Sequence, residues 1–255
     1  MRGFLGVLAL PLGMYAALCV LLYFMQRSQI YFPVPESDAP GATPLRLARN
    51  SVQLKIWVVP RPGPKALLYF GGNAEDVAAN VGAFAAAFPE HSLYLMNYRG
   101  YGGSTGRPSE HALVDDAVAL YDEVHPRHGE ICAMGRSLGS GVAVQLASRR
   151  SVAKLVLVTP FDSLVNVARG HYPYLPVVWL LRDRYDSARL APHIGAETLI
   201  VTAGADEIIP RARSQALAAA FAPARARSVA IDAARHNELD LRREYLDEVR
   251  RFLAY

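Results

Sequence analysis

The sequence predicts a doubly wound α/β domain with a mostly parallel sheet, carried behind one N-terminal transmembrane helix. Strand-like runs rich in β-branched and aromatic residues alternate with helix-like stretches over residues 46–255. Several of these runs are apolar at every position, as strands buried on both faces of a parallel sheet are. In front of them, Phe4 to Met25 runs for 22 residues without a charged side chain.

The N-terminal run is long enough to cross a bilayer. At about 1.5 Å per residue, a helix of this length spans about 33 Å, against a hydrocarbon core of about 30 Å. A cleaved signal peptide is the alternative, but its apolar region is about 7 to 15 residues long and ends at small residues. This run ends in LLYFMQRSQ, and Pro11 is tolerated as a kink in a spanning helix. We therefore expect an uncleaved single-pass anchor at residues 1–26.

The rest of the chain divides into a linker and a catalytic domain. Residues 27–45, rich in Pro, Gly and Ala, are expected to be an extended linker, and residues 46–255 to be the domain. The amino terminus and Arg2 outnumber Arg27 on the other side of the anchor, which favours an extracytoplasmic catalytic domain.

Seven runs have the composition of strands, and helical patterns lie between most of them. Residues 109–124 show apolar side chains at helix spacing behind Pro108 and a capping Ser109. The seven strand-like runs are VQLKIWVV, ALLYF, SLYLMNY, EICAMG, KLVLVTP, TLIVTAG and SVAIDA.

The sequence GRSLG, residues 135–139, lies between a predicted strand and a predicted helix. A G-x-S-x-G pattern at such a turn is a nucleophile elbow, which holds its serine in a strained backbone conformation. Gly135 and Gly139 are needed because a side chain at either position would strike the neighbouring strand or helix, and Gly141 would let the helix pack closely on the sheet. Ser137 is therefore the expected nucleophile.

A nucleophilic serine needs a base, and the base needs a group that orients it. Asp206 lies just after the strand-like run TLIVTAG, and His236 lies between the last strand-like run and the terminal helix. The order serine, aspartate, histidine is the one found with this type of elbow. Both residues leave the C-terminal edge of a strand, where the sites of open α/β sheets form. We therefore expect a triad of Ser137, Asp206 and His236.

Other acidic and histidine residues are weaker candidates. Asp162 also follows a strand and could supply the carboxylate, although a local cap of the next turn is the simpler interpretation. Glu207 and Asp232 have no expected role. His125 and His128 flank a proline at a helix end and are expected to face solvent.

Acyl transfer also requires an oxyanion hole, in which each backbone donor contributes about 10²–10³ in rate. The N–H of Leu138, at the start of the elbow helix, is one expected donor. The loop GGNAEDV follows an earlier strand and offers Gly71, Gly72 and Asn73, of which the Asn73 N–H is favoured. The alternative is that the Gly-Gly pair simply connects a strand to a helix.

Composition argues against other function classes. The net charge of +4 comes from arginines scattered over helix ends, which is typical of solvated surface and not of a nucleic-acid stripe. Cys19 and Cys132 provide neither a disulfide framework nor a thiolate metal site. We expect no metal, no cofactor and no nucleic-acid partner.

The chain resembles the membrane-anchored, bud-emergence-type α/β hydrolases, near the serine aminopeptidase-like branch of that superfamily. The matching segments are, in order, QRSQIYFP, YFGGNAED, NYRGYGGSTGRPSE, GRSLGSG, AGADEIIP and RHNEL. The resemblance implies an α/β-hydrolase fold and catalytic roles for the same triad. It departs at Gly71, where many relatives carry a histidine whose hydrogen bond would be missing here.

Two segments bear on substrate. The glycine-rich loop from Tyr98 to Gly106 is expected to shape the pocket, with Gly72, Tyr98 and Tyr101 as substrate contacts. Arg99 in it could bind an anionic group, but a structural ion pair is favoured. The 37 residues from Phe161 to Glu197 allow a small flap but no large cap. Within them HYPYLPVVWLL packs as a short core helix, or it lines an acyl groove or touches the bilayer.

These patterns predict a membrane-tethered serine hydrolase that cleaves carboxylic esters or thioesters. Its partners would be a small acyl ester or lipid-like substrate and a membrane, contacted through residues 4–25. A peptidase or amidase using the same triad, and a non-catalytic scaffold, are the alternatives.

Overall fold

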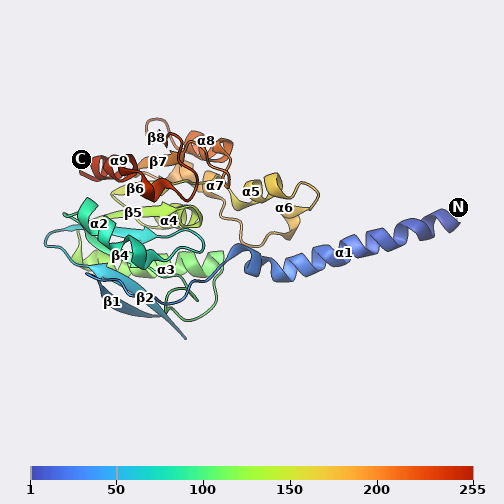
Figure 1. Ribbon diagram of the computed structural model, residues 1–255, viewed down its shortest axis with the longest axis horizontal. Helices are drawn as coiled ribbons and strands as arrows, with labels where there is room; N and C mark the ends of the chain where they lie inside the picture. Colours follow the sequence, from blue (N-terminus) through green and yellow to red (C-terminus); the bar gives the residue numbers. More distant parts are fainter. Residues whose placement is uncertain (1, 50, 255) are drawn as a thin grey trace.

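The computed structural model describes residues 2–49 and 51–254, with side chains from residue 10 onward. It has an eight-stranded sheet in the order β1-β2-β4-β3-β5-β6-β7-β8, in which β1, β2 and β4 pair antiparallel and the others pair parallel (Figure 1). The doubly wound, mostly parallel sheet predicted from the sequence is confirmed. The strands are β1 (Thr43–Arg49), β2 (Val52–Val59), β3 (Lys65–Phe70), β4 (Ser92–Met96), β5 (Glu130–Arg136), β6 (Lys154–Val158), β7 (Glu197–Ala203) and β8 (Ala226–Ile231).

Helices cover both faces of the sheet. One core joins the sheet to α3 (Glu110–Val124), α4 (Leu138–Arg149) and α8 (Arg211–Ala220). The second core, on the other face, joins it to α2 (Val81–Ala87) and α9 (Arg243–Ala254). In β3 the side chains alternate between the two cores, with Leu68 and Phe70 in the first and Leu67 and Tyr69 in the second. Burial of both faces explains why these strands are apolar at nearly every position.

Strand β1 was not predicted. It has the sequence TPLRLAR, pairs with β2 along its whole length, and is mostly exposed at the edge of the sheet. Its arginines and its proline are typical of an edge strand, and they mask the strand pattern in the sequence. The extended segment between α1 and β1 is therefore shorter than the predicted linker at 27–45, because α1 (Arg2–Ile30) enters it from one side and β1 from the other.

Helix α1 projects from the domain and carries the N-terminus at its far end (Figure 1). In the described part of the chain, one helix is long and apolar enough to cross a membrane; its candidate span is Leu10–Ile30, with a mean hydropathy of 1.3 and only 6% of its most apolar 18-residue stretch buried. A signal sequence near the N-terminus would meet the same criteria of length and hydropathy. The helix continues to Ile30, past the predicted end of the anchor at residue 26.

The segment between β6 and β7 is a small flap, made of α5 (Leu164–His171), α6 (Val177–Leu180) and α7 (Ser187–Leu190). Helix α6 contacts α1 outside the body of the domain (Figure 1). Tyr174 and Trp179 are 89% and 85% exposed, so the interpretation of HYPYLPVVWLL as a core helix is wrong. Within the described residues, no further element of the chain covers these two aromatic side chains.

Helix α4 approaches the sheet through glycine. A Cβ atom at Gly139 would overlap the carbonyl oxygen of Phe70 in β3, and one at Gly135 would overlap the backbone of Gly139. Both glycines therefore act as predicted. Gly141 differs, because a Cβ there would meet the ring of Tyr185 at 2.7 Å and not the sheet.

We predict that Gly139→Ala lowers the free energy of unfolding by about 3 kcal/mol, because the methyl group strikes backbone that cannot move aside. Gly82→Ala in α2 is the matched control, since a Cβ there has nothing within 4 Å; it should be neutral or stabilising by up to about 1 kcal/mol. Urea unfolding in detergent measures both, and equal effects of the two substitutions would contradict the prediction.

Candidate active site

Ser137 lies in the sharp turn between β5 and α4. Its φ of 48° and ψ of −114° are outside the regions that non-glycine residues ordinarily adopt. The backbone N–H of Ser137 donates to the carbonyl of Val158 at 2.8 Å, and the hydroxyl of Ser140 donates to the Ser137 carbonyl at 2.6 Å. These bonds hold the strained residue so that its side chain stands at the C-terminal edge of the sheet.

His236 and Asp206 complete a chain of hydrogen bonds with Ser137. The Ser137 Oγ lies 3.0 Å from His236 Nε2, and His236 Nδ1 lies 2.8 Å and 3.0 Å from the two oxygens of Asp206. The side chains of His236 and Asp206 are only 4% and 6% exposed. The structure thus brings together the three residues that the sequence analysis selected from segments 69 and 30 residues apart.

The carboxylate of Asp206 is itself fixed by backbone donors. Its Oδ1 accepts from the N–H groups of Ile208 and Ile209 at 2.9 Å and 2.7 Å. With the carboxylate on the Nδ1 side, the tautomer that donates from Nδ1 leaves Nε2 free to accept the serine proton. The arrangement can therefore activate a hydroxyl nucleophile.

Glu207 has a role that the sequence analysis missed. Its Oε2 accepts from the backbone N–H of His236 at 3.2 Å. A hydrogen bond from its own backbone N–H, followed by the bond from His236 and the nearby charge of Arg235, lowers the pKa of Glu207. Glu207 thereby ties the loop of the histidine to the loop of Asp206. No spacing in the sequence marks this contact, because it joins two loops.

Leu138 and Asn73, which line the same pocket as Ser137, each have a backbone N–H that is unpaired within the described part of the chain. In contrast, the Gly72 N–H donates to Glu75 at 2.6 Å. The Asn73 side chain is fixed, because its Oδ1 accepts from the Phe32 N–H and from the Tyr101 hydroxyl, both at 2.9 Å. These are the two donors that the sequence analysis expected for an oxyanion hole, whereas the Gly72 N–H is already paired.

Gly72, Tyr98 and Tyr101 do not line the pocket, contrary to the expectation that they contact substrate. Tyr98 and Tyr101 are each 2% exposed, and the Tyr98 hydroxyl donates to the Gly71 carbonyl at 2.8 Å. Burial raises the pKa of both tyrosines, so their hydroxyls remain donors. Both aromatic side chains of this glycine-rich turn point into the core. From there they hold the loop at residues 71–73, Tyr98 through the Gly71 carbonyl and Tyr101 through the Asn73 side chain.

Arg136 connects three parts of the site from beneath the elbow. Its guanidinium pairs with Asp240, lies 3.9 Å from Glu75, and donates to the backbone carbonyl of His236 at 3.4 Å. Burial lowers the pKa of Arg136, but the carboxylates of Glu75 and Asp240 raise it above its ordinary value, so the side chain stays charged. The sequence analysis missed this role.

Glu75 carries the network to the oxyanion loop. Besides the Gly72 N–H, its carboxylate accepts from the Tyr69 hydroxyl at 2.5 Å and from the Asn80 amide at 2.6 Å. A Cβ at Gly71 would lie 2.7 Å from Val77 and 3.3 Å from Glu75, so the space next to this position is already filled. Glu75 therefore fixes the loop that contains Gly71, the position at which the resemblance implies a histidine in many relatives.

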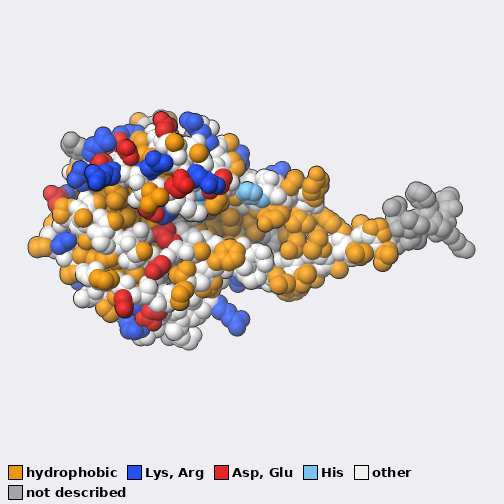
Figure 2. Space-filling view, viewed as in Figure 1, with side chains coloured by type: hydrophobic (Ala, Val, Ile, Leu, Met, Phe, Trp, Pro, Cys, Tyr) orange, Lys and Arg blue, Asp and Glu red, His pale blue; other side chains and the backbone are white. Residues whose placement is uncertain are grey.

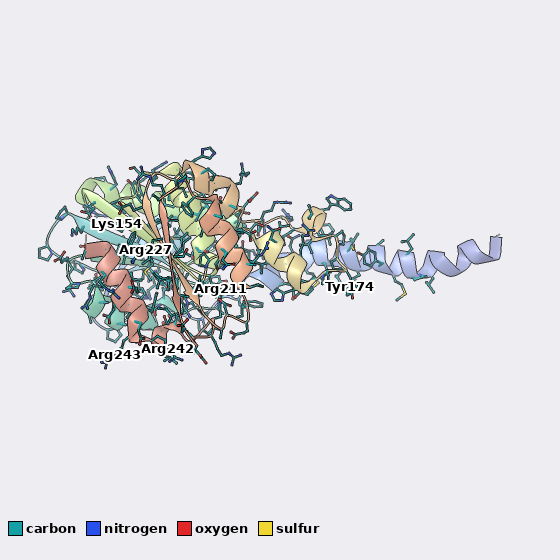
Figure 3. The ribbon with its side chains drawn as sticks, turned by 90° about the horizontal axis from the view of Figure 1, so that it is seen from above. Lys154, Tyr174, Arg211, Arg227, Arg242 and Arg243 are labelled. Carbon is teal, nitrogen blue, oxygen red and sulfur yellow. The ribbon has the colours of Figure 1, made fainter. Side chains whose placement is uncertain are left out.

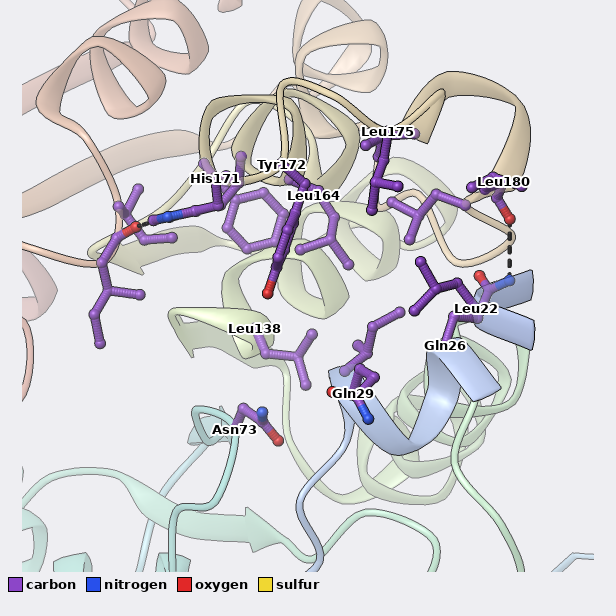
Figure 4. A pocket seen from close by; sticks show the side chains of 18 of the residues that line it. Leu22, Gln26, Gln29, Asn73, Leu138, Leu164, His171, Tyr172, Leu175 and Leu180 are labelled. Atoms are coloured by element: carbon purple, nitrogen blue, oxygen red, sulfur yellow. Dashed lines mark hydrogen bonds between the residues drawn. The ribbon is translucent and has the colours of Figure 1, made fainter. Parts of the chain in front are cut away.

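A pocket of about 400 Å³ opens at Ser137 (Figure 4). Its walls come from three parts of the chain: the flap, the residues after Asp206, and the C-terminal turns of α1. Leu138 and Asn73 lie at its inner end, and Leu22, Gln26 and Gln29 of α1 face the flap across it (Figure 4). The lining is mainly aliphatic.

Arg99 and Asp162, the other polar residues considered for the site, make structural contacts. Arg99 makes a bidentate pair with the fully buried Asp116 at 2.6 Å and 2.7 Å, which confirms the favoured ion pair. Asp162 accepts from Asn166 and Arg213, at 2.6 Å and 3.1 Å, and the helix cap next to it is Ser163 instead.

The histidines of the HPRH segment differ from each other. His125 is exposed, as expected, but His128 is only 8% exposed and its Nε2 lies 2.9 Å from the Tyr94 hydroxyl, so the expectation that it faces solvent is wrong. The buried tyrosine hydroxyl draws it inward.

A group of possible metal ligands lies at the opposite edge of the sheet. Ligand atoms of His91, Glu130 and Cys132 lie within 4.8 Å of one another. Burial raises the pKa of Cys132 to about 12, which keeps its thiol protonated and a poor ligand. The sequence analysis had recognised no such group, because His91, just before β4, lies 39 residues before Glu130 and 41 before Cys132, both in β5.

The chain was compared with known proteins. No family model matches it. It is 36% identical to an uncharacterized protein of Mycobacterium tuberculosis over 98% of this chain and 95% of that protein. It is 28% identical to the alpha/beta hydrolase domain-containing protein aho-3 of Caenorhabditis elegans, over 87% of this chain and 68% of that one. It is 26% identical to alpha/beta hydrolase domain-containing protein 17C of Xenopus laevis, over 92% and 76%.

The chain belongs to the α/β hydrolase superfamily. Solved structures share the fold: an esterase of Pyrococcus furiosus superposes with a TM-score of 0.70 at 15% identity, covering 88% of this chain and 95% of that one. An enol-lactonase of Burkholderia xenovorans gives 0.65 at 16% identity, covering 83% and 100%. In this α/β hydrolase the candidate triad lies at the sheet edge where β5, β7 and β8 end.

We predict that Arg136→Met slows the reaction of Ser137 with a fluorophosphonate by about 10- to 100-fold, because small displacements of the histidine and oxyanion loops have large effects on rate. Arg213→Met is the matched control. It breaks the pair with Asp162, which is also partly buried at this edge of the sheet but does not touch the site.

Both substitutions should lower the free energy of unfolding, since each leaves a carboxylate without its partner. Labelling kinetics and urea unfolding of the two variants separate positioning from stability. Equal slowing in both variants would show that Arg136 acts only through stability.

Proposed function

We propose that this protein is a serine hydrolase that cleaves carboxylic esters or thioesters through an acyl-enzyme on Ser137. The observation that carries the proposal is the continuous hydrogen-bond chain from Ser137 through His236 to Asp206, beside two unpaired backbone N–H groups. This is the constellation that acyl transfer requires.

In the proposed mechanism, Ser137 Oγ attacks the acyl carbonyl and its proton passes to His236 Nε2. The negative charge that forms on the carbonyl oxygen is stabilised by the N–H groups of Leu138 and Asn73. His236 then gives its proton to the leaving alcohol or thiol, and the ester bond to Ser137 remains. A water molecule repeats the sequence, with His236 as base and then as acid, and releases the carboxylic acid. These steps require no diffusible cofactor.

A peptidase or amidase and a non-catalytic scaffold are the two alternative functions. A peptidase or amidase would use the same groups, and it differs only in having to protonate an amine leaving group. A non-catalytic scaffold would be expected to lack part of the triad, and the close contacts among Ser137, His236 and Asp206 argue against it. Haloalkane and epoxide chemistry require an aspartate at the position of Ser137.

We further propose that α1 tethers the enzyme to a membrane, as in the membrane-anchored, bud-emergence-type branch that the chain resembles. From the charges on the two sides of the anchor, we propose that the catalytic domain lies outside the cytoplasm. The exposed apolar surface of α1 supports a bilayer environment (Figure 2). Its last turns contact the flap through buried polar groups, and cleavage as a signal sequence would remove them.

Ser137→Ala and His236→Ala are expected to abolish fluorophosphonate labelling and ester hydrolysis, and Asp206→Asn to lower kcat by about 10⁴ by favouring the wrong histidine tautomer. Asp232→Asn is the matched control, because Asp232 is an exposed carboxylate near the same sheet edge without a contact to His236. It should retain wild-type activity. A well-folded wild-type protein that neither labels nor hydrolyses esters would favour the scaffold.

Matched substrates distinguish the esterase from the amidase. We expect kcat/KM for an acyl ester or thioester to exceed that for the amide with the same acyl group by at least about 10²-fold, because a phenolate or thiolate leaves readily, whereas an amine leaves only after His236 has protonated it. Steady-state rates on p-nitrophenyl and p-nitroanilide derivatives of one acid measure the ratio. A ratio near one or below would support the peptidase alternative.

A further inference from the structure

The last turns of α1 are bound to the flap by buried polar side chains. Gln26, 8% exposed, donates to the Leu180 carbonyl at 3.0 Å, and its Oε1 accepts from the Arg182 N–H at 2.7 Å. Arg27 makes a bidentate pair with the buried Asp183 at 3.0 Å and 3.2 Å. Gln26 and Asp183 would be costly to bury without these partners, whereas the Arg27 side chain is 42% exposed.

Tyr31 extends this attachment into the core. Its hydroxyl donates to Asp183 at 3.0 Å and lies 3.0 Å from the hydroxyl of Tyr185, which is fully buried under α4. A flexible tether has no need of such contacts. They fix the rotation of α1 about its axis, so that one defined face of the helix looks toward the flap.

The face so fixed lines the pocket at Ser137. Leu22 of α1 stands opposite Leu175 and Leu180 of the flap (Figure 4), and Ile30 of α1 also lines the pocket. The stretch of helix from Leu22 to Ile30 is about 12 Å long at 1.5 Å per residue. Ile30 is near the oxyanion loop, since the N–H of Phe32 donates to Asn73. The pocket is therefore a groove that leads from the nucleophile outward along α1.

Two of the polar side chains that line this groove already have protein partners. The Gln26 amide binds flap backbone, and His171 Nε2 lies 3.1 Å from the Ile208 carbonyl (Figure 4). What remains facing the groove is largely aliphatic surface from three elements. Such a lining fits an unbranched hydrocarbon chain and offers little to a polar one.

The outer end of the groove meets an apolar surface. Tyr174 and Trp179 of the flap project beside α1 (Figure 3 shows Tyr174), and the hydroxyl of Tyr15 donates to the Tyr174 carbonyl at 2.7 Å. Apolar side chains gather over this region, whereas charged ones are spread over the domain (Figure 2). Amphipathic aromatic side chains are typical of the boundary between bilayer and water.

We propose that α1 forms one wall of an acyl-chain groove, and that the substrate is a long-chain fatty acyl ester or thioester whose chain enters from the membrane along α1. The inference rests on the proposed hydrolase function, and it adds that the anchor helix is part of the substrate site. The acyl carbonyl would lie at Ser137 and the chain would run past Ile30 to Leu22.

The test uses the full-length protein in phosphatidylcholine nanodiscs with p-nitrophenyl palmitate and p-nitrophenyl butyrate. Leu22→Trp places a bulky ring in the groove, and Leu21→Trp, the matched control, changes a neighbouring residue of α1 that is 53% exposed and does not line the pocket. We expect the ratio of kcat/KM for palmitate to that for butyrate to fall at least about tenfold in Leu22→Trp and to keep its wild-type value in Leu21→Trp. Equal ratios in all three proteins, or an equal fall in both variants, would overturn the proposal.

A second measurement does not depend on hydrolysis. A fatty acid with a diazirine in its chain is photo-crosslinked to the Ser137→Ala protein in the same nanodiscs, and adducts are mapped by mass spectrometry. Adducts on residues 161–181 are expected, falling at least about fivefold when Leu22→Trp is added and persisting with Leu21→Trp. Their absence, or their insensitivity to Leu22→Trp, would overturn the groove. Adducts with this pattern in a protein whose wild type hydrolyses neither ester would support the groove and refute the proposed function alone.

Discussion

The strained backbone of Ser137 is the constraint on which the rest of the site depends. A positive φ at a non-glycine residue costs of order 1–3 kcal/mol and persists only where the surroundings determine it. Here it persists because Gly135 and Gly139 let β5, α4 and β3 approach more closely than any side chain would allow, and because Ser137 hydrogen bonds to β6. The same strain aims the hydroxyl at the sheet edge, where the loops after β7 and β8 bring Asp206 and His236 to it.

The loops around the elbow are coupled through charge. Arg136 is part of the strand that carries the nucleophile, and it reaches Asp240 and the His236 carbonyl on one side and Glu75 on the other. One buried guanidinium therefore sets the positions of the base loop and the oxyanion loop relative to the nucleophile. The tyrosines of the glycine-rich turn support the same oxyanion loop from the core, through the Gly71 carbonyl and the Asn73 side chain.

Helix α1 connects this chemistry to its surroundings. Its outer part is exposed and apolar, while its last turns bind the flap through Gln26, Arg27 and Tyr31. One continuous helix thus has an exposed apolar part and a part that packs on the flap, and the pocket begins where these two parts meet. In the proposed enzyme, the geometry of the substrate site and the depth of the domain at the membrane would be set by the same residues.

The sequence by itself determined the elements whose signal is local. Apolar runs predicted seven of the eight strands, the glycine spacing around Ser137 predicted the elbow, and the positions of Asp206 and His236 after strands predicted that they would meet Ser137. Edge strand β1 was not predicted, because an exposed strand lacks the run of apolar residues that marks the buried strands. Contacts between distant segments were decided only by the tertiary structure. They include the pairing of Arg136 with Asp240, 104 residues away, and the pairing of Gln26 with the flap. They also include the inward orientation of Tyr98 and Tyr101. A polar side chain has many possible partners in an unfolded chain, and packing selects among them.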